Sequence, residues 1–229
     1  MKLASQRYIN HLENLGEFQN RIFAMRHGEG THNADGIIIS SMERGLKEAP
    51  LTEKGKTEVR ENSKTFISNL SVQGCNGKIL VVASPFLRTV QTAKEFVDSV
   101  NSADGVSSGL KAELIGIDKN FRERFFGIFE GRNSGTYYQE VWEADRFDSI
   151  REKSVEKTNV VEDRVTRGIA LLNEAFRKKI ILIVSHADPI QIMKTATAKI
   201  PSKFHHHHFE VKPYIKPAEI VELKVKPRR

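Results

Sequence analysis

Short apolar runs alternate along this chain with segments whose apolar residues recur at helical spacing. Residues 21–25, 78–83 and 180–184 are rich in Ile, Leu, Val and Phe, as is typical of strands buried on both faces. A weaker strand is predicted at 112–117, and residues 218–225 alternate polar and apolar as an exposed or edge strand does. Strands that alternate with helices predict an α/β domain of three layers, α/β/α, with a mainly parallel central sheet.

Helices are predicted between these strands. Thr52 is a candidate N-cap for a helix in which Val59, Phe66 and Leu70 lie at helical spacing. The spacing of apolar residues predicts further helices from about residue 86, around 137–142, near 160–178 and from 187 to about 198. Tyr8, Leu12 and Leu15 predict one more short helix near the N-terminus.

Two segments have no steady period. Residues 30–50 contain glycines, serines and mixed charges and predict a long excursion over one end of the sheet. Residues 121–132 form a loop that is dense in charged and aromatic residues. Aromatic bulk can anchor such a loop while its polar side chains face a cleft.

Composition limits the class of protein. The chain has 229 residues, 39% of them hydrophobic and 28% charged, which is ordinary for a soluble globular protein. No repeat or linker divides it, so we expect a single domain over residues 1–229, with a basic tail at 224–229. A lone cysteine, no apolar leader and no apolar run of about 18 residues predict an intracellular protein of the cytoplasm or nucleus, without a membrane partner.

The net charge of +7 fits an anionic substrate, nucleic acid or an acidic surface, and it is equally consistent with a basic surface that only confers solubility. The basic tail carries no interleaved aromatic residues, so we do not expect a nucleic-acid partner. A nucleic-acid binder would show steep salt dependence of binding.

Polar residues follow three of the predicted buried strands where each strand ends. Arg26 and His27 follow the first, Arg88 comes shortly after the second, and His186 follows the last. In open α/β sheets this edge is where ligands bind. Arginine offers a planar fork of donors to an oxyanion, and a neutral imidazole is a competent nucleophile toward phosphorus. The pattern therefore predicts a phosphate site.

These residues stand within longer motifs. Arg26-His27-Gly28-Glu29 is followed by Asn33, and Pro50-Leu51-Thr52 by Gly55. The remaining blocks are residues 84–93, Glu123 with Gly127 and Glu130-Gly131, and His186. In this order, over about residues 21–190, they resemble the histidine phosphatase superfamily, the branch with phosphoglycerate mutases and fructose-2,6-bisphosphatases. The chain departs from the common pattern at Gly30 and Ala187, both small residues.

The resemblance implies a phosphoglycerate mutase-like fold and a role for each matching residue. His27 would be the nucleophile that forms a phosphohistidine, and Glu123 the general acid and base. Arg26, Arg88 and a protonated His186 would supply positive charge to the phosphoryl group. The resemblance also implies substrate-binding positions at Asn33, Gly28, Glu29 and Ala187. No metal or other cofactor is expected, because the arginines take the role of the cation.

We therefore expect a metal-independent phosphatase that hydrolyses a small phosphomonoester. One alternative is a phosphoglycerate mutase-type phosphotransferase, although the longer basic, proline-containing insertion of those enzymes is missing. Another is a catalytically inactive module that binds phosphate or phosphopeptide. The sequence leaves the substrate and the oligomeric state open.

Other histidines and basic residues lie outside these roles. The tract His205–His208 could chelate a metal through alternate residues if it were extended, but no acidic or cysteine residues cluster with it in the sequence. We therefore expect a flexible or incidental tract without a metal. Further basic side chains near the predicted site could recognise a second anionic group, but we expect them to be solvated: His32, Arg44, Lys47, Arg124 and Arg132.

Overall fold

The computed structural model describes residues 8–102, 109–147, 149 and 154–226. Within them, five strands form one sheet in the order β3-β2-β4-β1-β5. The strands are β1 (Arg21–Arg26), β2 (Gly77–Ala83), β3 (Leu110–Ile117), β4 (Ile180–Ser185) and β5 (Ile220–Leu223). All neighbouring pairs are parallel except β1 and β5. The predicted α/β class, the mainly parallel sheet and the edge position of the last strand are confirmed.

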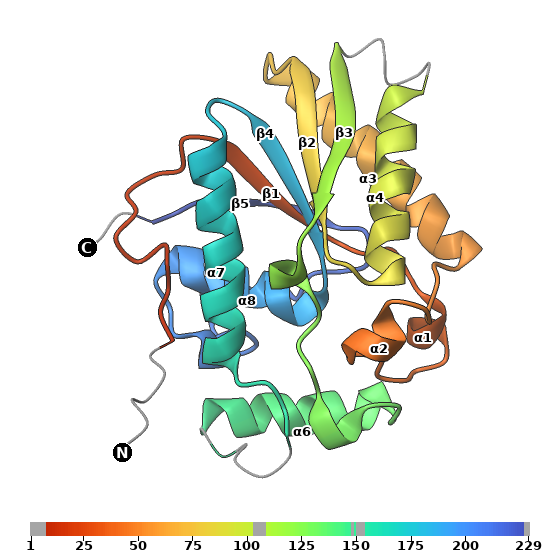
Figure 1. The fold of residues 1–229 in the computed structure, drawn as a ribbon, viewed down its shortest axis with the longest axis vertical. Coiled ribbons are helices and arrows are strands. Elements are labelled where there is room, and N and C mark those ends of the chain that lie inside the picture. The colour runs from red at the N-terminus through yellow and green to blue at the C-terminus, as the bar shows by residue number, and fades with distance from the viewer. Residues whose placement is uncertain (1–7, 103–108, 148, 150–153, 227–229) are drawn as a thin grey trace.

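Helices cover both faces of the sheet, which gives the predicted three layers (Figure 1). Successive side chains of a strand point to opposite faces, so Phe23 and Met25 pack with α3 (Glu53–Val72) and α4 (Leu87–Asn101). Ile22 and Ala24 instead pack with α7 (Thr158–Ala175) and α8 (Ala187–Ala198). Thr52 caps α3 as predicted, because its side chain accepts a hydrogen bond from the Gly55 amide.

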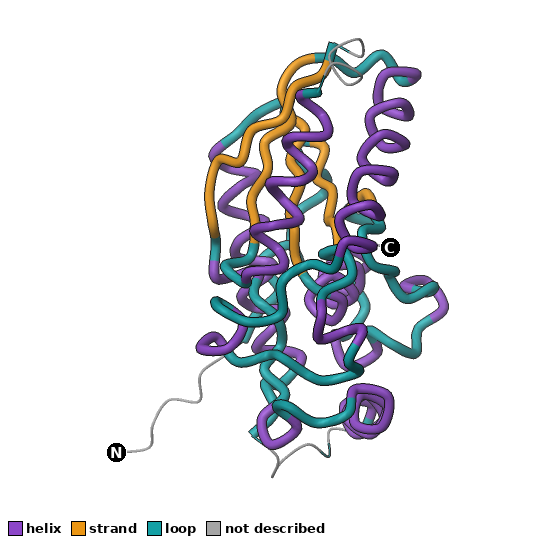
Figure 2. Tube along the Cα trace, turned by 90° about the vertical axis from the view of Figure 1, so that its right-hand side faces the viewer, coloured by secondary structure: helices purple, strands orange, loops and turns teal. Residues whose placement is uncertain are grey.

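The remaining elements gather beyond the carboxyl ends of the strands, where Figure 2 shows most of the loops. The excursion after β1 contains α1 (Thr31–Ala34) and α2 (Met42–Gly45). The loop after β3 contains the 3₁₀ turns η1 (Lys119–Phe121) and η2 (Gly127–Phe129) and leads into α6 (Ser134–Arg146). Two further 3₁₀ turns, η3 (Ser202–Phe204) and η4 (Phe209–Val211), follow α8.

The predicted N-terminal helix is wrong for the residues that the structure describes, and residues 1–7 lie outside them. Residues 8–18 form an irregular segment with a turn at 11–14. Leu12 is fully buried in the same core cluster as α7 and α8. The segment meets its hydrogen bonds across the fold, since the His11 amide donates to the Thr166 hydroxyl and the Asn10 amide group to the Ala196 carbonyl. The apolar spacing thus reflects packing rather than a helix.

The start of the predicted basic tail is held in place. The Lys226 amide donates to the Thr197 carbonyl, and its ammonium group pairs with Glu210 at 2.9 Å. Residues 227–229 lie outside the described part of the chain. No helix among the described residues is long and apolar enough to cross a membrane.

Candidate active site

The carboxyl ends of β1, β2 and β4 bring the predicted residues together. Arg26 is in register with Ser185, and the His27 amide donates to the Ser185 carbonyl at 3.0 Å. On the other side of β4, the Ser84 amide donates to the Val184 carbonyl. His27 and His186 therefore lie close together, with their ring centroids 5.2 Å apart.

His27 is fixed in one orientation. Its Nδ1 lies 2.8 Å from the Gly28 carbonyl oxygen, so this nitrogen carries the ring proton, and Arg88 Nε donates to its Nε2 at 3.2 Å. Burial, followed by the charge of Arg88, lowers the pKa of His27 well below its usual range. The imidazole is therefore neutral near pH 7, and its unprotonated Nε2 accepts the hydrogen bond from Arg88.

Arg88 lies in the first turn of α4 and is completely buried. Its Nη2 donates to the Ile39 carbonyl at 3.0 Å and lies 3.9 Å from Glu123 Oε2. Burial lowers the pKa of Arg88 to about 10, opposed by the charge of Glu123. The guanidinium group therefore stays charged near neutral pH and links the excursion after β1 to the loop after β3.

Glu123 follows η1 in the sequence, after Arg122, and its side chain is buried. Its Oε1 accepts from the Arg124 amide at 2.9 Å, and its Oε2 lies 3.7 Å from His186 Nδ1. Burial raises the pKa of Glu123 to about 7, although the nearby Arg88 charge opposes the shift. The carboxyl group can thus both donate and accept a proton near neutral pH, as a general acid and base must.

His186 is oriented by a serine. The Phe86 amide donates to the Ser84 hydroxyl oxygen, whose own proton is free to bond His186 Nε2 at 2.8 Å. His186 Nδ1 then carries the ring proton and faces Glu123. Burial, followed by the charge of Arg88, lowers the pKa of His186 well below its usual range. The predicted protonated form is therefore disfavoured in this structure, while a phosphate dianion would act in the opposite direction by stabilising the imidazolium.

Several buried nitrogens around His27 have no hydrogen-bond partner in the described part of the chain. They are Arg26 Nε, His32 Nδ1, Arg88 Nη1 and His186 Nδ1. The rings of His32 and His186 both lie within 5.5 Å of the His27 ring, centroid to centroid. An unpaired buried polar group is costly, so the clustering of four such nitrogens around one imidazole indicates a site built for an oxyanion.

A cavity of about 170 Å³ opens at this place. Of the predicted site residues, it is lined by Arg26, His27, Asn33, Glu123 and Ala187. Arg88 and His186 lie beneath the lining and are fully buried. Aromatic side chains form much of the remaining wall, contributed by Phe126, Tyr138, Trp142 and Tyr214.

Gly28 and Glu29 do not line this cavity. A Cβ on Gly28 would lie 2.5 Å from the Gly55 carbonyl oxygen, so the glycine permits close packing of the loop on α3 rather than the approach of a ligand. The Glu29 carboxylate accepts from Lys54 Nζ at 2.6 Å and from the Thr52 hydroxyl at 3.0 Å. In this structure both residues anchor the loop to the start of α3.

Two residues expected to be solvated are buried. His32 is 4% exposed and lines the cavity. Arg124 is fully buried, because its guanidinium group binds both carboxylate oxygens of Asp145 at 2.6 and 2.7 Å and also bonds Asp188. The expectation is wrong for these two, since His32 lines the buried cavity and the charge of Arg124 is paired inside the fold. Lys47 and Arg132 are exposed as expected.

Asp188 is the main polar residue of the cavity that sequence reasoning missed. It is 2% exposed and accepts from Trp142 Nε1 and the Tyr214 hydroxyl, each at 3.2 Å, and from Arg124 at 3.3 Å. Burial is outweighed by the two neighbouring histidines, His205 and His206, which hold the pKa of Asp188 well below its usual range. Its position two residues after His186 was a usable signal, but its partners lie far away in the sequence.

Arg164 was also missed. Its Nη1 donates to the carbonyls of Asn120 and Arg122, and its Nη2 donates to the Glu123 carbonyl at 3.2 Å. Its Nε bonds Glu156 at 2.9 Å. A single buried side chain on α7 therefore holds the backbone of the loop that carries Glu123.

The histidine tract differs from its prediction. Residues 205–207 form a turn after η3 rather than an extended strand, and His205 is fully buried. Asp188 lies beside the tract, 3.6 Å from His205 Nε2 and 3.4 Å from His206 Nε2. The sequence did not show this acidic neighbour, because it comes from α8 through the tertiary fold.

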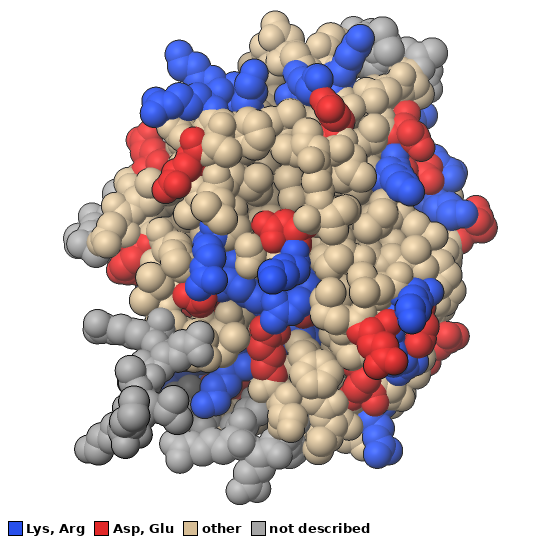
Figure 3. Space-filling model, in the orientation of Figure 1, with Lys and Arg blue, Asp and Glu red and all other residues tan. Residues whose placement is uncertain are grey.

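Charge on the surface is mixed. On the face shown in Figure 3, Lys and Arg side chains lie among Asp and Glu over most of the surface, with basic groups more frequent at the top. Ion pairs on the surface of the described residues include Lys78 with Glu113 at 2.6 Å and Arg60 with Glu95 at 2.6 Å. This face therefore carries no uninterrupted basic stripe.

Comparison with known proteins identifies a family. The model of the histidine phosphatase superfamily (branch 1) matches residues 22–229. A search of curated proteins found no match.

Solved structures show the same fold. One is an alpha-ribazole phosphatase from Shigella flexneri, with 23% identity, a TM-score of 0.60, and coverage of 87% of this chain and 88% of that chain. Another is a phosphoserine phosphatase variant from Entamoeba histolytica in complex with phosphoserine, with 15% identity, a TM-score of 0.63 and 88% of each chain covered. A mycobacterial glucosyl-3-phosphoglycerate phosphatase gives 18% identity and a TM-score of 0.60, with 88% of each chain covered.

Proposed function

The chain belongs to branch 1 of the histidine phosphatase superfamily, and we propose that it is a metal-independent phosphomonoesterase that acts through a phosphohistidine on His27. The observation that carries this proposal is the neutral His27, which lines the cavity with an unprotonated Nε2 and around which four buried nitrogens lack a partner within the described chain. The solved phosphatases of the same fold are consistent with it.

In the first step, the Arg88 Nε–H bond moves from His27 Nε2 to a phosphoryl oxygen. The freed Nε2 lone pair attacks phosphorus, and the bond between phosphorus and the ester oxygen breaks. Glu123 gives its proton to the leaving alkoxide, for which its pKa of about 7 is suited. In the second step the Glu123 carboxylate takes a proton from water, and the resulting hydroxide attacks phosphorus. The N–P bond breaks, inorganic phosphate leaves, and both His27 and Glu123 return to their starting states.

Charge on the phosphoryl oxygens is met by fixed donors. Phosphoryl transfer spreads negative charge over three equatorial oxygens, so catalysis depends mainly on positioning and electrostatics. Arg26 Nε, Arg88 Nη1 and His186 Nδ1 are the unpaired donors that would bind these oxygens. Asn33 lines the cavity and would add a neutral donor. We assign to Arg26 and Arg88 the role of a cation that balances the charge of the phosphoryl oxygens.

The substrate class follows from the cavity. A volume of about 170 Å³ suits a phosphoryl group with a small organic group attached. The leaving group would lie against the aromatic wall formed by Tyr138, Trp142 and Tyr214. We therefore propose a small phosphorylated metabolite as substrate.

The family match over residues 22–229 supports a single domain.

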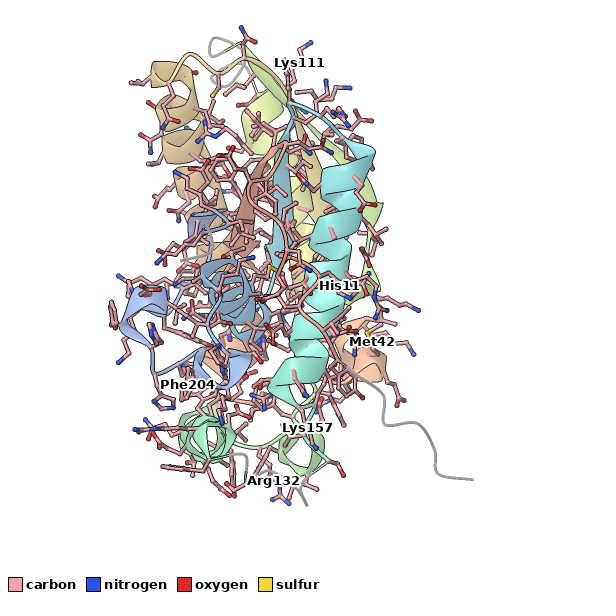
Figure 4. The ribbon with its side chains drawn as sticks, turned by 90° about the vertical axis from the view of Figure 1, so that its left-hand side faces the viewer. His11, Met42, Lys111, Arg132, Lys157 and Phe204 are labelled. Carbon is pink, nitrogen blue, oxygen red and sulfur yellow. The ribbon has the colours of Figure 1, made fainter. Side chains whose placement is uncertain are left out.

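Hydrolysis of p-nitrophenyl phosphate in EDTA tests this function. Wild type should turn over, and His27→Ala should lose more than about 10³-fold in kcat, as expected for removal of a nucleophile. His11→Ala is the matched control, because His11 pairs with Asp163 on α7 and does not line the cavity (Figure 4). If wild type hydrolyses no phosphomonoester but binds inorganic phosphate, the protein is a binding module.

A further inference from the structure

Asp188, His205 and His206 form a second cluster of metal-ligating groups, here called the Asp188 cluster. One carboxylate oxygen and one nitrogen from each imidazole all lie within 4.8 Å of one another. The histidines come from the turn that follows η3, which contacts α6, and Figure 4 shows Phe204 next to that helix. Asp188 comes from the first turn of α8. None of the roles proposed above uses the two histidines.

His205 points to a missing cation. Its Nδ1 lies 3.0 Å from the Ser202 carbonyl oxygen, so this nitrogen carries the ring proton and Nε2 carries a lone pair. Nε2 is buried, has no hydrogen-bond partner among the described residues, and lies 3.6 Å from Asp188 Oδ2. Two acceptors that face each other in a buried place repel unless a cation lies between them. A metal ion or an added proton would satisfy both.

His206 is held in position for the same role. Its Nε2 lies 3.4 Å from Asp188 Oδ1. Its ring stacks on Trp142 with centroids 3.4 Å apart and lies 4.4 Å from the Tyr214 ring. Zinc binds His and Asp at about 2.0–2.2 Å in a tetrahedron, which places neighbouring ligand atoms about 3.3–3.6 Å apart. The two nitrogen-to-oxygen distances, 3.6 Å from His205 to Oδ2 and 3.4 Å from His206 to Oδ1, fall close to this spacing, each to a different oxygen of Asp188.

The local charge permits a divalent ion. Arg124 is the one cationic side chain that bonds Asp188 among the described residues, and it also holds Asp145 with two shorter bonds. One guanidinium group thus serves two buried carboxylates, which leaves one negative charge before the histidines are counted.

We propose that Asp188, His205 and His206 form a zinc site on the wall of the substrate cavity. Two imidazoles and one carboxylate suit zinc and disfavour magnesium, which prefers oxygen ligands alone. Three protein ligands leave a fourth position for water or another ligand. Asp188 and Trp142 line the cavity, so a bound ion would lie next to the substrate. The site takes no part in the phosphoryl transfer proposed above and does not depend on it.

Equilibrium dialysis of the full chain against Zn²⁺, without substrate, tests the site. Wild type should bind one ion per chain. His205→Gln and His206→Gln should each weaken binding by more than about 100-fold, since even residues that only orient ligands are worth about 10–100-fold. Mg²⁺ should not compete.

The double variant His207→Gln, His208→Gln is the matched control within the same tract. His207 Nε2 lies 3.2 Å from the Trp142 carbonyl, and His208 Nδ1 accepts from the Glu210 amide. Neither residue belongs to the Asp188 cluster, so the control should bind zinc within about threefold of wild type.

Two outcomes overturn the proposal: no stoichiometric zinc in wild type, or equal loss in the control, which would mean chelation by the tract at large. Thermal melting in EDTA shows which variants fold. If the buried His205→Gln variant does not fold, the zinc affinity of the His206→Gln variant decides between the outcomes. Zinc should raise the melting temperature of wild type but not of His206→Gln, because only a site present in the folded state stabilises it. Turnover in EDTA is measured separately, so failure of the phosphatase proposal leaves this test intact.

Discussion

Arg88 Nε donates a hydrogen bond to His27 Nε2 over 3.2 Å, although the two residues come from different elements. His27 follows β1, and Arg88 lies in the first turn of α4. The contact places a buried cation against the nitrogen that we propose as nucleophile. The charge of Arg88 helps to keep His27 neutral. The contact also places the unpaired Nη1 of Arg88 where phosphoryl oxygens would lie.

Replacing Arg88 by Ala should therefore lower kcat by about 100-fold or more, since loss of one preorganised donor costs about 3 kcal/mol in other enzymes. The measurement is hydrolysis of p-nitrophenyl phosphate by folded protein, checked by a melting curve. Arg60→Ala is the control, because Arg60 is exposed and pairs with Glu95 on the outside of α4. A folded Arg88 variant with nearly normal turnover would place Arg88 outside the chemistry.

Glu123→Gln should reduce hydrolysis of alkyl phosphates far more than hydrolysis of p-nitrophenyl phosphate. A general acid contributes about 10²–10⁴-fold when the leaving group is a poor one, and less for a good leaving group such as p-nitrophenolate. Glutamine keeps the size of the side chain but has no acidic proton. The ratio of the two kcat values gives the result, and equal damage to both substrates would count against Glu123 as the acid.

The same residue should make stability depend on pH. Burial raises the pKa of Glu123 from the ordinary 4.5 to about 7, so the folded state holds this proton more tightly than the unfolded state. Stability from this group is therefore greatest below about pH 4.5 and falls as pH rises toward 7. The loss amounts to at most about 3 kcal/mol.

Urea denaturation at pH 5 and pH 8 measures this effect. Glu123→Gln should gain stability relative to wild type at the higher pH, because it has no carboxylate to bury. A variant of the exposed Glu61 to Gln controls for the change in net charge. A constant difference between wild type and Glu123→Gln at the two pH values would show that the carboxyl group titrates normally.

Arg164→Met should lower kcat for alkyl phosphates by about tenfold or more with a smaller change in KM, because Arg164 holds the backbone that carries Glu123. As a positioning residue, it should have less effect on p-nitrophenyl phosphate, for which the acid matters least. Arg167→Met on the same helix is the control, since that side chain is half exposed and pairs only with Asp163 among the described residues. Equal loss on both substrates would indicate general damage to the fold instead.

Much of the site could be predicted because its residues follow strands. The apolar runs at β1, β2 and β4 are long enough to identify, and parallel strands deliver their carboxyl ends to one edge of the sheet. That rule brings His27, Arg88 and His186 together without knowledge of any contact. Glu123 needed the resemblance to a family, because a charged loop has no period that places it.

The rest of the site depends on contacts between distant segments. Asp188 meets Tyr214 from 26 residues away and Trp142 from 46, and no local pattern encodes such pairs. Leu12 shows the same limit for the fold, since its burial against α7 and α8 gave apolar spacing without a helix. The His205 turn also depends on its neighbours, because the acidic partner comes from α8.

The most direct test of the central claim is to trap the phosphoenzyme. Wild type is mixed with substrate in EDTA, quenched within one turnover, kept at alkaline pH to preserve phosphohistidine, and digested for mass spectrometry. The account predicts one acid-labile phosphoryl group on His27 in wild type and none in His27→Ala. Turnover by wild type with no phosphoryl group on His27, or with the group on another residue, would contradict it.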